Sequence, residues 1–191
     1  MSFLIMNALH SMDNHILPEC YLDTNLMESL LPTKKGYNHQ KGCNEVIRVM
    51  QHKFKGRFAV GILDRDKDSP DKLKTKNFNF IDEKHNLRLY RHQSEHHYLI
   101  LHPPIEKWLI AESKQVNLSL EFYNLSSNLD ELKKLSKPKT SKDNPRFKTV
   151  FEKLKEHNAN GITQLLNWTD YLIKNPDNAD ETYLKNIGNA S

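Results

Sequence analysis

The stretch "RFAVGILDRDKDSP", residues 57–70, decides the fold class of this chain. Its apolar first half is rich in β-branched and aromatic residues, which predicts a strand buried on both faces. Asp64 and Asp66 follow this strand, two residues apart. Because alternate residues of an extended chain point to the same side, we expect these two carboxylates to converge where the strand ends.

The segments before this strand predict strands that alternate with helices. Residues 15–32, "HILPECYLDTNLMESLLP", read as a strand and then a helix, because Asn25 and Glu28 have the spacing of a capping box. Residues 34–54 read as a short extended piece followed by a second helix. The apolar face of that helix is predicted to comprise Val46, Ile47, Met50 and Phe54. Such an order is typical of a mainly parallel α/β sheet.

After the opening stretch, residues 65–77 are charged and predict a loop. "LRLYRHQ" and "HHYLILHP" predict two strands joined by a tight turn, and a helix follows with Pro104 at its first position. Further on, residues 117–137 and two segments that meet near Gly161 are amphipathic and predict helices. The polar stretch at 138–145 predicts a linker. We therefore expect three parts: an α/β domain at 1–113, a helical C-terminal cover at 114–175 and a flexible tail at 176–191.

Composition narrows the class of protein. The chain has 191 residues, a length that suits one domain with a small appendage. Its net charge of +4 is compatible with a polyanionic partner without requiring one. No apolar run approaches the roughly 20 residues that span a bilayer, and "MSFLIMNALHSM" at the start has no basic residue before its apolar patch. The two cysteines are too few for a disulfide framework, so we expect a cytoplasmic protein without a membrane partner.

Acidic residues at strand ends point to a metal site. In open α/β sheets, ligands bind beyond the carboxyl ends of the strands, where Asp23, Asp64 and Asp66 are expected. Crowded carboxylates repel one another, and a hard divalent cation, Mg²⁺ or Mn²⁺, relieves that repulsion. If Asp23 and Asp64 share a metal, their carboxylates should lie within roughly 6 Å of each other. The alternative is a solvated acidic and basic turn at residues 64–72.

These motifs together resemble the Toprim domain of topoisomerases, bacterial primases and nucleases of the overcoming-lysogenization-defect type. The resemblance covers roughly residues 15–110 and includes the Gly-then-helix step "GCNEV" and the Asp-x-Asp pair. It implies that Asp23, Asp64 and Asp66 hold Mg²⁺ for phosphodiester chemistry on DNA or RNA, most simply as a nuclease. The segment "PPIEKWL" is similar to a later family segment, which implies that Glu106 joins the site.

The chain also departs from the family pattern. Asp23-Thr24 stands where the family usually has Glu followed by Gly, and Glu19, the alternative acid, precedes the expected end of the strand. The sequence contains no ATPase motif, so a protein partner would have to supply an ATPase. One alternative is a catalytically inactive Toprim-like regulator that acts through a protein partner. A receiver-like phosphoacceptor is a third reading.

Several basic residues have two interpretations. Lys67 either balances its acidic neighbours or contacts a scissile phosphate. His96 and His102 fit no zinc motif and are expected at the surface or in turns, while His39 is a candidate for binding phosphate. The basic stretch at 132–148 is either a solvated helix end and linker or a contact to a phosphate backbone. The second reading uses Lys133, Lys134, Lys137, Lys139, Lys142 and Arg146.

Overall fold

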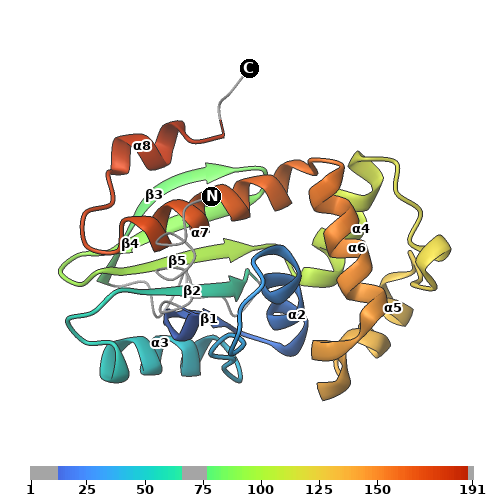
Figure 1. Ribbon diagram of the computed structural model, residues 1–191, viewed down its shortest axis with the longest axis horizontal. Helices are drawn as coiled ribbons and strands as arrows, with labels where there is room; N and C mark the ends of the chain where they lie inside the picture. The colour runs from blue at the N-terminus through green and yellow to red at the C-terminus, as the bar shows by residue number, and fades with distance from the viewer. Residues whose placement is uncertain (1–12, 66–76, 189–191) are drawn as a thin grey trace.

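A computed structural model describes residues 13–65 and 77–188 of the chain. The described residues form a five-stranded sheet with the order β1-β2-β5-β4-β3 (Figure 1). The first three strands in this order are parallel, and β4 is antiparallel to both of its neighbours. The strand bounds are β1 Ile16–Pro18, β2 Ala59–Asp64, β3 Phe78–Lys84, β4 Leu87–His92 and β5 His97–His102. The expectation of an α/β fold with a parallel core is confirmed, although the sheet as a whole is mixed.

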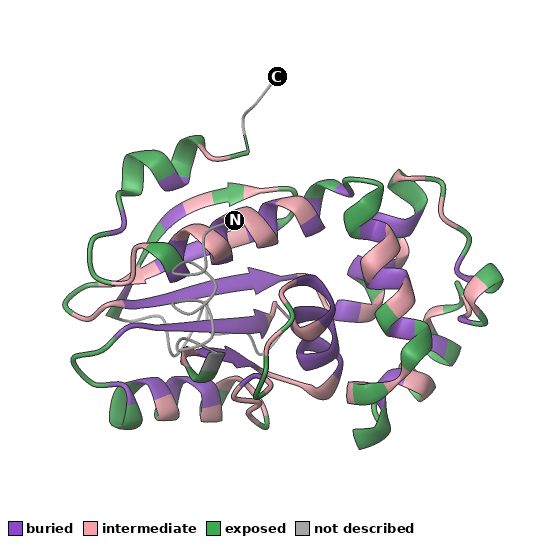
Figure 2. Ribbon diagram, viewed as in Figure 1, coloured by how far each residue is buried: buried purple, intermediate pink, exposed green. Residues whose placement is uncertain are grey.

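Burial follows the type of strand. The parallel strands are buried almost throughout, as expected for strands covered on both faces, and Figure 2 shows them as the centre of the molecule. Edge strand β3 is half exposed, and Phe80 keeps 55% of its surface in contact with solvent. Strand β3 was not predicted from the sequence. Its turn into β4 consists of His85 and Asn86, both with positive φ, as a two-residue hairpin turn requires.

Helices cover both faces of the sheet. Helix α3 (Cys43–Lys53) packs on one face through the predicted apolar positions, and α2 (Tyr21–Leu30) and α7 (Asn160–Lys174) cover the other. Gly61 of β2 permits the close approach of α3. A Cβ atom at this position would lie 2.8 Å from Val46 Cγ1 and 2.9 Å from Leu99 Cδ2.

The remaining helices follow the last parallel strand. Helices α4 (Ile105–Gln115), α5 (Leu129–Ser136) and α6 (Pro145–Glu156) stand beyond the carboxyl ends of the parallel strands, at the right of Figure 1. The two C-terminal helices predicted around Gly161 are confirmed as α6 and α7, and their apolar faces are buried. Within the described residues, no helix combines the length and apolar character needed to cross a membrane.

Two C-terminal segments differ from expectation. Of residues 117–137, only α5 and the short helix η3 (Glu121–Tyr123) are helical, because Asn124 adopts a left-handed conformation that ends η3. The stretch predicted as a linker contains the short helix η4 (Lys139–Asp143), which packs against α2. There the Asn25 side chain donates hydrogen bonds to the carbonyl oxygens of Ser141 (2.9 Å) and Asn144 (3.1 Å). These contacts explain why the stretch packs against α2, although Ser141 is the one residue of η4 that is buried.

The tail expected to be flexible from residue 176 contains helix α8 (Glu181–Asn186). Leu184 is fully buried, and its carbonyl oxygen accepts a hydrogen bond of 3.0 Å from Trp168 Nε1. The few apolar residues of this polar segment, Ala179, Tyr183, Leu184 and Ile187, were too weak a pattern to predict this helix.

Candidate metal centre

The first acidic site residue lies on a helix rather than at the end of a strand. Strand β1 ends at Pro18, and the amide of Glu19 donates a hydrogen bond of 3.0 Å to the Ile62 carbonyl. Helix α2 then begins at Tyr21 because Cys20 and Asp23 cap it reciprocally. The Asp23 amide donates to Cys20 Sγ at 3.3 Å, and the Cys20 amide donates to Asp23 Oδ2 at 3.1 Å.

This capping corrects two predictions from the sequence. Asp23 was expected at the end of the first strand and Asn25 at the N-cap, whereas both lie inside α2. Cysteine is an unusual N-cap residue, so Cys20 was not predicted as the N-cap of this helix. Glu19 is the acid that directly follows the strand.

Three side chains meet at the carboxyl edge of the sheet. Asp64 ends β2 and His102 ends β5, and the parallel register places these two residues opposite each other. Asp23 reaches them from α2, so that one ligand atom from each of the three residues lies within 4.8 Å of the others. This separation is inside the roughly 6 Å expected for a shared metal. Asp23 and His102 are fully buried, and the Asp64 side chain is 27% exposed.

Glu19 supports this cluster through the backbone. Its Oε2 accepts a hydrogen bond of 2.9 Å from the Asp64 amide, and its Oε1 accepts one of 3.0 Å from the Cys43 amide. Glu19 thus connects the ends of β1 and β2 to the first residue of α3. Burial, with a smaller contribution from the charge of Asp23, raises the pKa of Glu19 from its ordinary value to about 7.

The cluster shares its charge between two acids and one imidazole. Burial and the neighbouring Asp23 carboxylate raise the pKa of Asp64 to about 8. Burial disfavours the charged imidazole of His102, but the carboxylates of Asp23 and Asp64 outweigh that effect and raise its pKa to about 9. Without a bound cation the cluster therefore retains protons near neutral pH.

The donor atoms fit a divalent cation. His102 Nε2 lies 3.3 Å from Asp23 Oδ1, and His102 Nδ1 lies 3.2 Å from Asp64 Oδ1. Among the described residues, Asp23 Oδ1, Asp64 Oδ1 and His102 Nε2 are nevertheless buried without a hydrogen bond of acceptable geometry. Buried polar atoms rarely lack a hydrogen bond, so these three atoms are candidate ligands of one ion that would replace their contacts with one another.

The other predicted site residues have different positions. Glu106, in the first turn of α4, lines the same cleft as Asp64 and accepts a hydrogen bond from Ser136 Oγ, but it is not one of the three clustered residues. Asp66 and Lys67 lie outside the described residues. His39 is partly buried beside the ring of Tyr21, with 4.3 Å between the ring centroids, and burial lowers its pKa.

His102 is the site residue that the sequence analysis missed. It was expected at the surface or in a turn, yet no part of it is exposed. Its position at the end of an apolar strand was visible in the sequence. The pairing of that strand with β2, which places His102 beside Asp64, was not.

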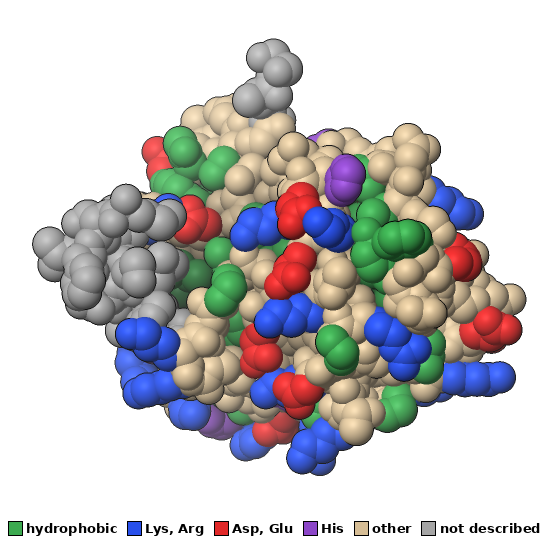
Figure 3. All heavy atoms as spheres, turned by 45° about the vertical axis from the view of Figure 1, so that its right-hand side comes forward, with side chains coloured by type: hydrophobic (Ala, Val, Ile, Leu, Met, Phe, Trp, Pro, Cys, Tyr) green, Lys and Arg blue, Asp and Glu red, His purple; other side chains and the backbone are tan. Residues whose placement is uncertain are grey.

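A cleft opens next to the metal centre. It has a volume of about 700 Å³, and its described walls are the end of β2, the first turn of α4 and one side of α5. Its described lining residues are Asp64, Arg65, Pro104, Glu106, Lys107, Lys133 and Lys137. Figure 3 shows that acidic and basic side chains alternate over the helical side of the molecule, so positive charge gathers only locally.

No protein-family model, curated protein or solved structure matches this chain.

Proposed function

We propose that this protein is a divalent-metal-dependent phosphodiesterase acting on nucleic acid, most simply a nuclease, with its metal held by Asp23, Asp64 and His102. The observation that carries the proposal is the group of three ligand atoms within 4.8 Å at the carboxyl edge of the parallel strands. The adjoining cleft supports it, because a substrate can reach the exposed side of Asp64 there. The motif resemblance to Toprim domains points to the same chemistry.

The donor set indicates which ion binds. Two carboxylates suit Mg²⁺ and Mn²⁺, and an imidazole nitrogen is a poor ligand for Mg²⁺. We therefore expect Mn²⁺ to bind more tightly than Mg²⁺. Such an ion lowers the pKa of bound water and neutralises charge on a phosphate.

The residues of the chain divide the remaining work. In hydrolysis, a water oxygen forms a new bond to phosphorus, an ester P–O bond breaks, and the departing oxygen takes a proton. Glu106 lies on the cleft wall near Asp64, where its carboxylate can orient the attacking water and accept its proton. Both carboxylate oxygens of Glu19 accept hydrogen bonds from backbone amides, one of them from Asp64, so its role is to position Asp64.

A second candidate function rests on the contacts of His102. Its two ring nitrogens lie close to one acid each, so a protonated His102 offsets part of the negative charge of the cluster without any metal. In that case the protein is a catalytically inactive regulator that acts through a protein partner, and the triad is a buried ion network.

Metal titration and cleavage assays separate these candidates. Isothermal calorimetry with Mn²⁺ and Mg²⁺ should show one binding event in the wild type and none in Asp64→Asn. The matched control is Asp170→Asn, which removes a half-buried acid of α7 that pairs with Lys174 at 2.6 Å and lies outside the candidate site. Labelled single-stranded and duplex oligonucleotides should be cleaved with Mn²⁺, and EDTA should stop the reaction.

The outcomes point in different directions. Metal binding together with EDTA-sensitive cleavage that Asp64→Asn abolishes supports the phosphodiesterase. Absence of metal binding in a folded wild-type protein overturns it and favours the inactive regulator.

A further inference from the structure

Three lysines around the cleft have no acidic partner among the residues that the structure describes. No ion pair within residues 13–65 and 77–188 uses Lys107, Lys133 or Lys137, whereas Arg65 pairs with Glu83 at 3.1 Å. Their positive charges are available to an anion that enters the cleft.

The fold holds two of these lysines in place. Leu132 and Ser136 are buried and attach α5 to its neighbours, and Ser136 Oγ donates to the Glu106 carboxylate on α4. Lys133 and Lys137 are one helical turn apart and therefore project from the same side of α5. That side lines the cleft, so the two cations can bind neighbouring phosphates of one strand.

The first turn of α4 adds to the same anion site. Pro104 occupies the N-cap and supplies no side-chain acceptor to the amides of that turn. Amides at a helix N-terminus favour negative charge, and Lys107 in this turn has the same preference. Cations from two helices thus surround the space beside Asp64.

We infer that the lysine cleft binds the phosphates next to the scissile one in a single strand of nucleic acid, without reading its bases. This inference rests on the proposed phosphodiesterase function and specifies its substrate. The described lining contains no aromatic side chain on which a base could stack, so the phosphate backbone is what it can recognise. A volume of about 700 Å³ accommodates a short piece of one strand, in the size range of ordinary ligand pockets, and cannot enclose a duplex.

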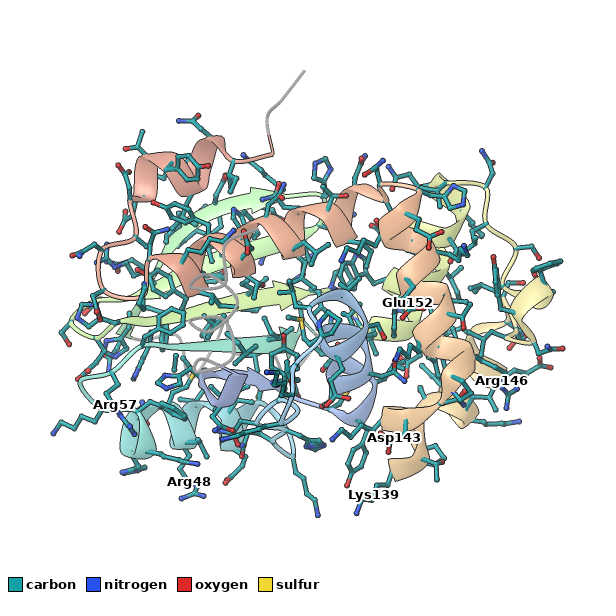
Figure 4. The ribbon with its side chains drawn as sticks, in the orientation of Figure 1. Arg48, Arg57, Lys139, Asp143, Arg146 and Glu152 are labelled. Atoms are coloured by element: carbon teal, nitrogen blue, oxygen red, sulfur yellow. The ribbon has the colours of Figure 1, made fainter. Side chains whose placement is uncertain are left out.

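The other basic residues of this region face elsewhere. Lys142 lies 3.5 Å from the Glu28 carboxylate, and Arg146 donates to the Asn124 carbonyl at 3.0 Å. Figure 4 shows Lys139 at the lower end of the helical layer and Arg146 on its outer side. Lys134 lines a different, shallow pocket. Of the basic stretch considered in the sequence, only Lys133 and Lys137 line the cleft.

An alternative role for these lysines is to stabilise the helices that carry them. Lysines in the last turn of a helix interact favourably with its dipole, which would account for Lys133 and Lys137 alone. That effect does not explain Lys107, which sits in the first turn of α4, where the dipole disfavours a cation. Binding of an anion in the cleft accounts for all three.

The test compares two pairs of lysines. Fluorescence anisotropy with a labelled 12-mer single strand, measured in EDTA from 50 to 200 mM salt, reports binding without cleavage. For Lys133→Gln/Lys137→Gln, the slope of log affinity against log salt should become shallower by about 1.4, because each phosphate contact on a single strand contributes about 0.7. The control pair Lys134→Gln/Lys139→Gln removes the same charge outside the cleft and should leave the slope unchanged.

The inference would be overturned if the two pairs of substitutions have equal effects, or if the slope is unchanged in the Lys133→Gln/Lys137→Gln variant. It would also be overturned if the protein binds a duplex of the same sequence more tightly than the single strand, or binds neither probe. Because the assay contains no divalent metal, it is independent of catalysis. Selective loss of strand binding without any cleavage activity would reject the phosphodiesterase and retain the strand site. If EDTA-sensitive cleavage is intact in the Lys133→Gln/Lys137→Gln variant, the phosphodiesterase is retained and the strand site is rejected.

Discussion

Replacing Asp64 with Asn should stabilise the metal-free protein. The Asp64 carboxylate is crowded by Asp23 and Glu19, and burial raises its pKa from 3.8 to about 8. An acid whose pKa is raised in the folded state contributes stability below its unfolded pKa and loses that contribution as pH rises through the folded value. Asparagine has no charge to bury, so the advantage of Asp64→Asn should be larger at pH 8.5 than at pH 5.

The size of this effect follows from the pKa. A difference of one pKa unit corresponds to about 1.36 kcal/mol, so the full change would be on the order of 5 kcal/mol. The Asp64 side chain is 27% exposed and also attracts the His102 imidazolium, and both features reduce that figure. A quarter of it, about 1.4 kcal/mol, still raises the Tm of a domain this size by about 3–6 °C.

Metal should reverse the ranking of the two proteins. At a Mn²⁺ concentration 100 times its Kd, the wild type should gain about 2.7 kcal/mol, or about 5–10 °C in Tm, and Asp64→Asn should gain nothing. Thermal unfolding followed by circular dichroism gives the Tm of each protein under four conditions, pH 5 and pH 8.5 with EDTA or with Mn²⁺. Asp170→Asn is the control. If Asp64→Asn loses several degrees at pH 8.5 in EDTA, or gains as much from Mn²⁺ as the wild type does, the reasoning is wrong and Asp64 is a structural residue.

Three further predictions concern the sheet and its acidic edge. Gly61→Ala should cost about 1–3 kcal/mol in urea unfolding, because the new methyl group overlaps Val46 and Leu99; an unchanged midpoint would show that α3 shifts freely. The metal-free wild type should lose stability from pH 5 to 8, because the native Glu19, with its pKa of about 7, holds a proton that the unfolded chain releases. Glu19→Gln should flatten this pH dependence even though it loses a backbone contact. An equally steep pH dependence in the variant would contradict this. Calorimetry of His102→Asn should show a larger loss of affinity for Mn²⁺ than for Mg²⁺, since only the imidazole nitrogen distinguishes the two ions in this site, and equal losses would remove His102 from the ligand set.

Much of the fold could be predicted because it rests on local patterns. The apolar run before Asp64 is buried as β2, and the helical faces that include Val46 and Phe151 pack as their spacing indicates. Errors arose where a segment is ordered by an uncommon turn or by contacts with distant parts of the chain. Strand β3 depends on a two-residue turn, and η4 depends on the Asn25 side chain across the layer.

The candidate site divides along the same line. The sequence by itself determined that Asp64 follows a buried strand and meets the carboxyl edge of a parallel sheet, because hydrophobic periodicity acts over a few neighbouring residues. Only the tertiary structure decided that Asp23 and His102 stand beside Asp64, and that Glu19 accepts a hydrogen bond from the Asp64 amide. These positions depend on strand register and on the packing of segments far apart in the chain, which no local pattern encodes. For the same reason, the lysine cleft between α4 and α5 exists only once the two helices have packed together.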